Sequence, residues 1–483
     1  MGSKKNLWFF VPLLGTVLCI VYVAAATRDV VYSDYIRLIN SYLPDVWNPK
    51  KFFVADVLTR IPVNYLGRII NVTVFGYSTT FDMMLGVLCL GASGIVLTFY
   101  CRKENLGLIW YLLLMFLLFS LNKWEMLTNG TGWCHFLAFW GFYYHYLVFD
   151  RVWGNRKQER AGKLSAEEKR RMARDRKCLI LLPWGITLGT AGPYCGAYSA
   201  VLLLVYGLCF FLDWREEKTP DWRYGIYGLQ VLLPLLLYLV SNAFAVQEYA
   251  GATGRSFGEV LGDNALFFPK FLIKSLSSMV LGEEAMMALL TSLNRGMGLG
   301  YFAGLLVLGA YLLALRLQVI YGIYRTTILP LLFILWGGLN HLLVLSARWI
   351  FEKSSYGMSS RYALQYQVGI FGILLTFALA GRLWERRRLG VKLCRGAVLF
   401  ISTVFFWGNL CTTWREIKTA PYRQDYADEV IAMALHYQEV PDDELEERFQ
   451  YRHGPERIRR ALGILEEQGW NVYRENTKYT EGD

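Results

Sequence analysis

Residues 7–26 read LWFFVPLLGTVLCIVYVAAA, an apolar run that follows Lys4 and Lys5. An α-helix rises about 1.5 Å per residue, so this run is long enough to cross about 30 Å of hydrocarbon. A secretory signal peptide has a similar basic start, and Ala24–Ala26 resembles a cleavage site, but the chain that follows continues as a membrane protein. We therefore predict that residues 7–26 form an uncleaved first membrane helix.

Further apolar runs repeat this pattern along the whole chain. Of its 483 residues, 54% are hydrophobic and only 18% are charged. A soluble domain keeps about a quarter of its residues charged, so the composition excludes a soluble globular enzyme. We predict an all-α polytopic membrane protein with about 11 transmembrane helices. The runs lie at approximately 7–26, 80–100, 107–121, 132–149, 178–192, 196–213, 224–244, 298–315, 326–345, 366–381 and 397–411.

Basic residues gather in alternate connections between these runs. The segment 150–177 has eleven Lys and Arg against five Asp and Glu, and Arg386–Arg388 lies in another connection. A cytoplasmic N-terminus puts every dense basic cluster on the cytoplasmic side, as the positive-inside rule requires. We predict a multi-pass protein of the cell membrane with an extracytoplasmic C-terminus. The same asymmetry accounts for the net charge of +11, so no nucleic-acid partner is implied.

This orientation divides the chain into a transmembrane domain, 1–411, and an extracytoplasmic tail, 412–483. The first outer loop, 27–79, is long and carries apolar residues at helical spacing, and the second large outer loop, 245–297, does the same. Amphipathic helices are therefore predicted in both loops. The tail is predicted to be a small helical cap with helices at Asp425–Tyr437, Asp442–Tyr451 and Glu456–Gln468.

Asp34 follows the first span directly and stands at the start of a predicted amphipathic helix. A carboxylate held at the outer interface can act as a general base on an acceptor hydroxyl. Ser33 and Asp34 are also good helix-capping residues, so a structural role is the alternative.

Trp124 and Glu125 lie in a polar turn, 122–130, between two very apolar spans. A carboxylate at membrane depth is costly unless it is paired or binds a ligand. This turn is therefore a candidate acceptor site, and a structural ion pair is the alternative.

A cationic outer loop contains Arg348, Lys353 and the run Met358–Tyr362. The planar fork of arginine binds a phosphodiester or pyrophosphate well, and an outer-leaflet lipid phosphate would lie at this depth. The alternative is an arginine that extends to lipid headgroups without a specific ligand. The sequence contains no phosphate-binding loop, zinc-ligand cluster or GxSxG motif, so it predicts no cofactor and no metal ligands.

This layout, with three short stretches, resembles the C superfamily (GT-C) of integral-membrane glycosyltransferases, and in particular its bacterial members that use polyprenyl-phosphate sugars. Lys123-Trp124-Glu125 with Gly130 is similar to their outer aromatic–Glu motif. Ser360-Arg361-Tyr362 is similar to the Ser-Arg-Tyr motif that begins a late helix, and Ile458–Val472 is similar to their closing helix.

The resemblance implies an enzyme of cell-surface glycan biosynthesis or modification. It would transfer a sugar from a polyisoprenyl-phosphate donor to a glycan or lipid-linked acceptor on the extracytoplasmic face of the bilayer. Asp34 would be the catalytic base, attack at the sugar C1 would invert its configuration, and positive charge would neutralise the leaving phosphate. The donor-binding residues would be Arg361, Tyr362, Arg348 and Arg68.

Two points of this assignment leave alternatives open. Many relatives carry two adjacent acids after the first helix, whereas Ser33 precedes Asp34 here, so Asp45 and Asp56 in the same loop are alternative bases. No outer carboxylate pair of the DxD kind is present, which favours chemistry without a metal.

Two other classes of protein share some of these features. A flippase or transporter for a lipid-linked sugar would also have a basic outer groove, but matching broken helices in two halves are not evident. A surface polysaccharide polymerase or ligase would also use outer arginines, but usually places them in a large late loop, and the late loop here, 346–365, is short.

Overall fold

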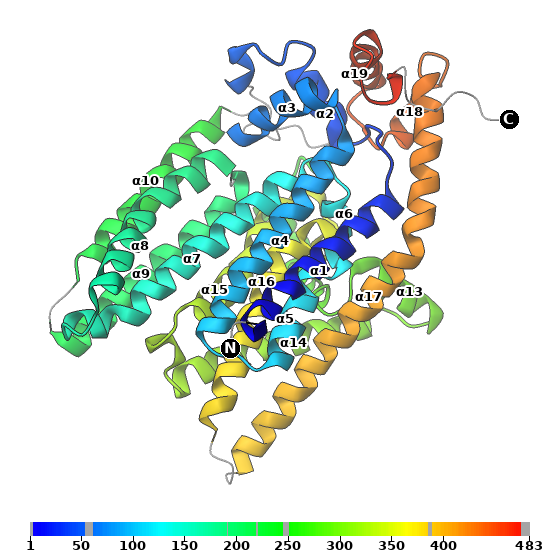
Figure 1. Cartoon of the computed structure of the whole chain (residues 1–483). Coiled ribbons are helices and arrows are strands. Elements are labelled where there is room, and N and C mark those ends of the chain that lie inside the picture. Colours follow the sequence, from blue (N-terminus) through cyan, green and yellow to red (C-terminus); the bar gives the residue numbers. More distant parts are fainter. Residues whose placement is uncertain are drawn as a thin grey trace.

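We describe a computed structural model of the chain, covering residues 3–53, 61–190, 192–218, 221–244, 251–384 and 389–474. Within these ranges all regular structure is helical and no strand occurs (Figure 1). The α-helices are α1 (Ser3–Ala26), α2 (Asp34–Tyr42), α3 (Pro62–Phe75), α4 (Thr79–Lys103), α5 (Leu108–Phe119), α6 (Trp124–Leu127), α7 (Gly132–Arg160), α8 (Ala166–Trp184), α9 (Cys195–Glu217), α10 (Arg223–Ala243), α11 (Phe257–Asp263), α12 (Phe267–Ser277), α13 (Glu283–Ser292), α14 (Gly298–Ile320), α15 (Leu329–Arg348), α16 (Ala363–Leu383), α17 (Leu389–Leu435), α18 (Asp442–Arg448) and α19 (Pro455–Glu467).

The chain is a polytopic helical membrane protein. Among the described residues, nine helical segments are long and apolar enough to cross a membrane, and each overlaps one of the predicted runs. They are Trp8–Ala26, Thr79–Lys103, Leu108–Leu127, Cys195–Glu216, Arg223–Ala243, Gly298–Ile320, Leu329–Phe351, Ser360–Leu383 and Val391–Leu435.

The two remaining predicted runs, 132–149 and 178–192, are also helical in their described residues, which leave out residue 191, but they are not apolar enough over sufficient length to count among the nine segments. The first forms the start of α7, where His, Tyr and Trp side chains lower the mean hydropathy. The second falls at the end of α8, which begins with a highly charged half, and in the π-helical turn Gly185–Thr190. Both helices lie alongside the other long helices in Figure 1.

Helix α16 forms the centre of the bundle. Every side chain from Ala363 to Ala380 is buried, and α14 and α15 pack against it. Helices α15 and α16 are in close backbone contact at two glycines, where a Cβ atom on Gly337 would lie 2.3 Å from the Cα atom of Gly369. Small residues at such crossings let helix backbones come into contact inside a membrane.

This crossing gives a stability prediction. We expect Gly337→Ala to lower the free energy of unfolding by about 1–3 kcal/mol, because the added methyl group overlaps a backbone that cannot move away. Gly338→Ala is the matched control, since a Cβ atom there meets nothing within 4 Å. Thermal unfolding of both variants in detergent measures the difference, and equal midpoints would contradict the close packing.

Helix α17 runs across residue 411, where the sequence analysis placed the end of the transmembrane domain. The sequence suggested that the last span ends at residue 411 and that a separate helix begins at Asp425, but α17 is one helix of 47 residues that continues past Pro421. The last turns of α17 therefore extend from the membrane-spanning part directly into the cap.

The cap is built from two distant parts of the chain. The first loop contributes α2 and α3, and the tail contributes α18, α19 and the end of α17, and together they bury one apolar cluster separate from the bundle core. Polar contacts join the same parts: Arg28 forms an ion pair with Asp428 at 2.7 Å, and the Ser33 N–H donates to the Phe449 carbonyl at 2.7 Å. The described residues of the first loop and of the tail that share this cluster thus form one structural unit (Figure 1).

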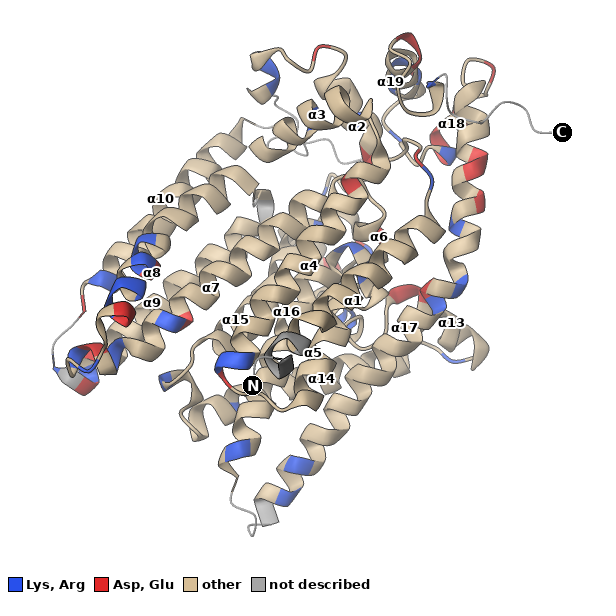
Figure 2. Ribbon diagram, viewed as in Figure 1, with Lys and Arg blue, Asp and Glu red and all other residues tan. Residues whose placement is uncertain are grey.

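Charged residues are concentrated at the two ends of the bundle. Figure 2 shows Lys and Arg at the ends of α7 and α16 and at the start of α17, toward the end where the N-terminus lies. Arg386–Arg388, which the orientation prediction also used, lie outside the described residues.

Candidate functional site

Three of the predicted site residues meet at the junction of bundle and cap. Asp34 is the first residue of α2, Glu125 lies on α6, and Arg361 lies in the short 3-10 turn Ser360–Tyr362 that leads into α16. The Arg361 Nε atom donates to Glu125, and its Nη1 atom lies 3.8 Å from the Asp34 carboxylate. The Asn129 side-chain amide donates to Asp34 at 3.2 Å. Segments more than 200 residues apart in sequence therefore bring two acids to one arginine.

The local fold turns the Asp34 carboxylate toward this cluster. Ser33 makes no side-chain capping bond and has φ at +53°, and its N–H is held by the cap at Phe449. Tyr35 packs directly on Gly130, where a Cβ atom would lie 1.9 Å from the ring. The helix-capping alternative for Ser33 is therefore not what the structure shows, and the Asp34 oxygen faces Asn129 and Arg361.

Glu125 holds Arg361 in place. Besides the arginine, its carboxylate accepts a hydrogen bond from the Ser360 hydroxyl at 3.0 Å. The structural ion pair that was the alternative role for Glu125 is therefore present. Its cation is Arg361, the residue predicted to bind the lipid phosphate. Asp34 is held less tightly than Glu125. Its closest partner is the amide of Asn129 at 3.2 Å, and Arg361 lies 3.8 Å away.

A second charged cluster lies beside the first and was not predicted. The guanidinium of Arg423, on α17, stacks on the Trp124 ring at 3.2 Å from its centroid and pairs with Glu416 at 2.7 Å. The Trp124 indole N–H donates to Glu284 at 2.9 Å, and Glu284 lies 3.6 Å from Arg423. Trp124 therefore links α6 to α13 and α17.

Burial, with a hydrogen bond to Glu416, raises the pKa of Glu284 to about 8. The folded protein then keeps a proton that the unfolded chain loses above about pH 4.5, so stability falls as the pH rises to about 8.

We expect Glu284→Gln to reduce this pH dependence, because the amide keeps the bond from Trp124 but does not titrate. The unfolding midpoint of the wild type should fall between about pH 5 and about pH 8 by more than that of the variant. Glu444→Gln, at an exposed position of α18, is the control and should keep the wild-type slope. Identical slopes for the wild type and Glu284→Gln would contradict the assignment.

Both clusters border a cavity of about 370 Å³ between bundle and cap, which we call the site cavity. Its charged lining residues are three arginines, Arg28, Arg361 and Arg423, and one acid, Glu125. The side chains of these arginines are 34%, 42% and 22% exposed, so each guanidinium is paired yet reachable. Each of these arginines is also paired with an acid, as Arg28 is with Asp428 and Arg423 with Glu416, so the cavity offers three reachable guanidinium groups that can donate to an anion. Aromatic lining residues are Tyr32, Tyr35, Trp124, Tyr422 and Tyr426.

A second hollow adjoins the site cavity. An apolar groove of about 810 Å³ runs between α1, α5 and α17, and Leu18, Val21 and Ile417 on its walls are exposed. Ala25 lines this groove and the next residue, Ala26, lines the site cavity. On α17, Ala420 lines the groove and the preceding residue, Thr419, lines the site cavity. The groove and the site cavity therefore lie next to each other along α1 and α17.

Asp34 does not itself line the site cavity but lies beside it, 3.8 Å from the lining residue Arg361, and the remaining candidates among the described residues lie elsewhere. Arg68 is fully buried in an ion pair with Asp82, which leaves its guanidinium no access to a ligand. Arg348 donates to the Tyr362 hydroxyl at 2.6 Å, and neither residue lines the cavity. Asp45 is exposed and makes no contact with the cluster, and Asp56 lies outside the described residues.

No group of three or more His, Cys, Asp and Glu side chains in the described part of the chain is arranged to hold a metal ion. Comparison with protein-family models, with curated proteins and with solved structures finds no match to this chain. Fold and site together define a multi-pass helical membrane protein with a cavity lined by three arginines at one end of its bundle, next to an apolar groove.

Arg28 and Arg423 are the site residues that the sequence analysis missed. Arg28 follows the first span by two residues, so its position at the interface was a usable signal. Arg423 was assigned to the soluble tail, yet Glu416 lies seven residues before it, which places both on one face of a continuous helix.

Proposed function

We propose that this protein is a membrane glycosyltransferase that moves a sugar from a polyisoprenyl-phosphate donor to an acceptor hydroxyl on the extracytoplasmic face. The observation that carries the proposal is an acid, Asp34, beside an arginine-rich cavity that adjoins an apolar groove. A lipid-linked sugar phosphate has matching parts, because its chain is apolar, its phosphate is anionic and its sugar is small enough for a cavity of about 370 Å³.

In this mechanism Asp34 takes the proton from the acceptor hydroxyl as the hydroxyl oxygen bonds to the sugar C1. The bond between C1 and the phosphate oxygen breaks, and the electron pair leaves with the polyisoprenyl phosphate. Arg361 stabilises the charge that develops on this phosphate, and Arg28 and Arg423 add to the positive field. A guanidinium fixed by Glu125 needs little reorganisation during the reaction, which is how preorganised charge lowers a barrier.

The proposed topology has eleven spans, with α7 and α8 added to the nine most apolar segments. The N-terminus is then cytoplasmic, and the cap and site cavity are extracytoplasmic. The basic ends of α7 and α8 support this orientation by the positive-inside rule. A phosphatase reporter fused to the C-terminus should be active, and a silent phosphatase with an active cytoplasmic reporter at the same point would contradict the orientation.

Reconstitution tests the reaction itself. The purified full chain is placed in proteoliposomes with radiolabelled polyprenyl-phosphate sugars and a mixed glycan acceptor, and released polyprenyl phosphate is measured. The expected result is release that depends on both protein and acceptor. Movement of the intact donor across the bilayer without release would instead identify a flippase. Transfer of whole oligosaccharide units would identify a polymerase or ligase.

A further inference from the structure

A hollow larger than the site cavity lies at the other end of the bundle. It encloses about 1360 Å³ on one face of α4 and α7, between α1 and α8. Trp8 lines it, whereas Ala26 on the same helix lines the site cavity, and 18 residues of helix separate the two by roughly 27 Å. We call it the distal cavity. No step of the proposed reaction uses it.

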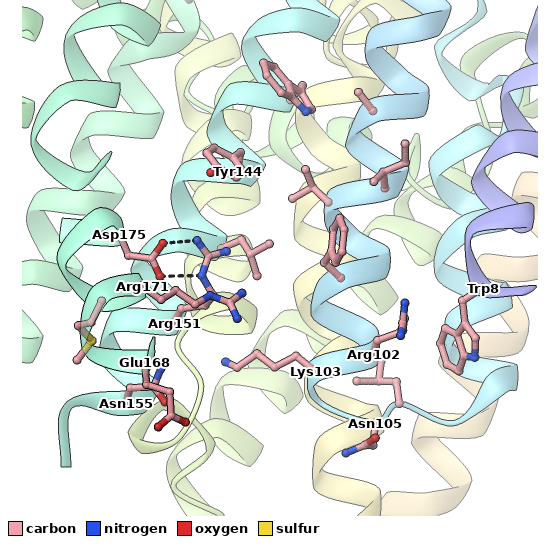
Figure 3. A pocket seen from close by; sticks show the side chains of 18 residues that line it. Trp8, Arg102, Lys103, Asn105, Tyr144, Arg151, Asn155, Glu168, Arg171 and Asp175 are labelled. Carbon is pink, nitrogen blue, oxygen red and sulfur yellow. Dashed lines mark hydrogen bonds and ion pairs between the residues drawn. The ribbon is translucent and has the colours of Figure 1, made fainter. Parts of the chain in front are cut away.

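The walls of the distal cavity differ along their length. The part deeper in the bundle is apolar, and Ile95, Phe99 and Trp140 are exposed there. Toward the helix ends the lining becomes basic, with Arg102 and Lys103 on α4, Arg151 on α7 and Arg171 on α8. Figure 3 shows Arg171 and Lys103 extending into the space between α8 and α4, with Arg102 on the side of Trp8.

Two of these four cations already have acid partners. Arg151 donates to both oxygens of Asp175, at 2.9 and 2.6 Å (Figure 3). Lys103 donates to Asp150 at 2.7 Å and lies 3.2 Å from Glu104. These ion pairs hold the side chains of Arg151 and Lys103 in place along the cavity wall.

The other two cations, Arg102 and Arg171, have no acid partner among the described residues. Arg102 lies 5.2 Å from the Phe9 ring centroid, a contact that leaves its N–H donors available. Glu168, the remaining acid of the lining, is used by Ser165 in a helix cap. The lining therefore has four cations and two acids, and both acids are occupied.

We propose that the distal cavity binds an anionic glycerophospholipid of the leaflet at this end of the bundle. The phosphate and the headgroup charge meet Arg102 and Arg171, and the acyl chains lie along Ile95, Phe99 and Trp140. Basic pockets between membrane helices bind such headgroups, and the cavity exceeds the roughly 300–1,000 Å³ of small-molecule sites. A soluble anion would not use the apolar wall, and a neutral lipid would not use the arginines. This inference is independent of the glycosyltransferase proposal.

Native mass spectrometry of the delipidated full chain in detergent tests the proposal. The protein is titrated with phosphatidylglycerol, with phosphatidylcholine of the same acyl chains, and with a polyprenyl phosphate. We expect the first phosphatidylglycerol to bind at least about tenfold more tightly than phosphatidylcholine. Equal affinity for the two phospholipids would overturn the proposal, and so would tighter binding of the polyprenyl phosphate than of phosphatidylglycerol.

Two double variants locate the binding. Arg102→Gln with Arg171→Gln should abolish the preference for phosphatidylglycerol. Arg170→Gln with Arg174→Gln removes the same charge from exposed positions of α8 that do not line the cavity, so it should keep the preference. Equal unfolding midpoints show that both variants fold. A preference that survives the first double variant, or that is lost in both, would overturn the assignment to this cavity.

Discussion

Asp34→Asn is expected to lower the rate of sugar transfer by about 10²–10⁴-fold, which is the usual contribution of a positioned general base. Asparagine has the same shape and can still contact Asn129 and Arg361, but it cannot accept the acceptor proton at neutral pH. Folding and donor binding should therefore stay close to the wild type. Release of polyprenyl phosphate measures turnover, and binding of the labelled donor is measured separately on the same preparation.

Asp45→Asn is the matched control for this prediction. Asp45 lies in the same loop and was one of the two alternative bases named from the sequence, but its side chain is exposed and does not line the site cavity. It should retain wild-type turnover. If Asp34→Asn were fully active and Asp45→Asn inactive, the base would be Asp45. If both were active, Asp56 would be the remaining acid to replace.

The meeting of Asp34, Glu125 and Arg361 could be anticipated from the sequence. Each residue lies within a few positions of the same end of an apolar span, and polar groups at that depth need partners. The partner of each residue could not be anticipated, because it depends on how α6 and the turn before α16 pack. Trp124 illustrates the limit, since its indole reaches an acid 160 residues away.

Arg68 and Arg423 show why the sequence alone does not identify the arginines that can reach a ligand. Arg68 was a candidate because it is basic and outer, but Asp82 lies 14 residues later, inside an apolar run, and neutralises it in the core. Arg423 was omitted because the last span was predicted to end at residue 411, which assigned this arginine to the polar tail. Tertiary packing decides both cases: burial occupies the first guanidinium, and a continuous α17 carries the second to the site cavity.

Arg361→Ala is expected to weaken donor binding and to lower kcat by about 10²-fold, a loss typical of removing one preorganised donor to developing charge. The guanidinium would contact the phosphate in both the bound donor and the leaving group, so KM should rise as kcat falls. Arg361→Lys should recover only part of the activity, because it keeps the charge and loses the forked geometry. Arg460→Ala, on the exposed face of α19, is the control and should behave as the wild type.

A purely structural role for Arg361 predicts a different pattern, and Glu125 allows the two roles to be separated. Arg361→Ala leaves the carboxylate of Glu125 partly buried without its cation, and that alone could disturb the turn before α16. Adding Glu125→Gln removes this unpaired charge. If Arg361 only neutralises Glu125, the double variant should regain transfer. If Arg361 binds the phosphate, the double variant should recover the unfolding midpoint of the wild type while KM stays high and kcat stays low.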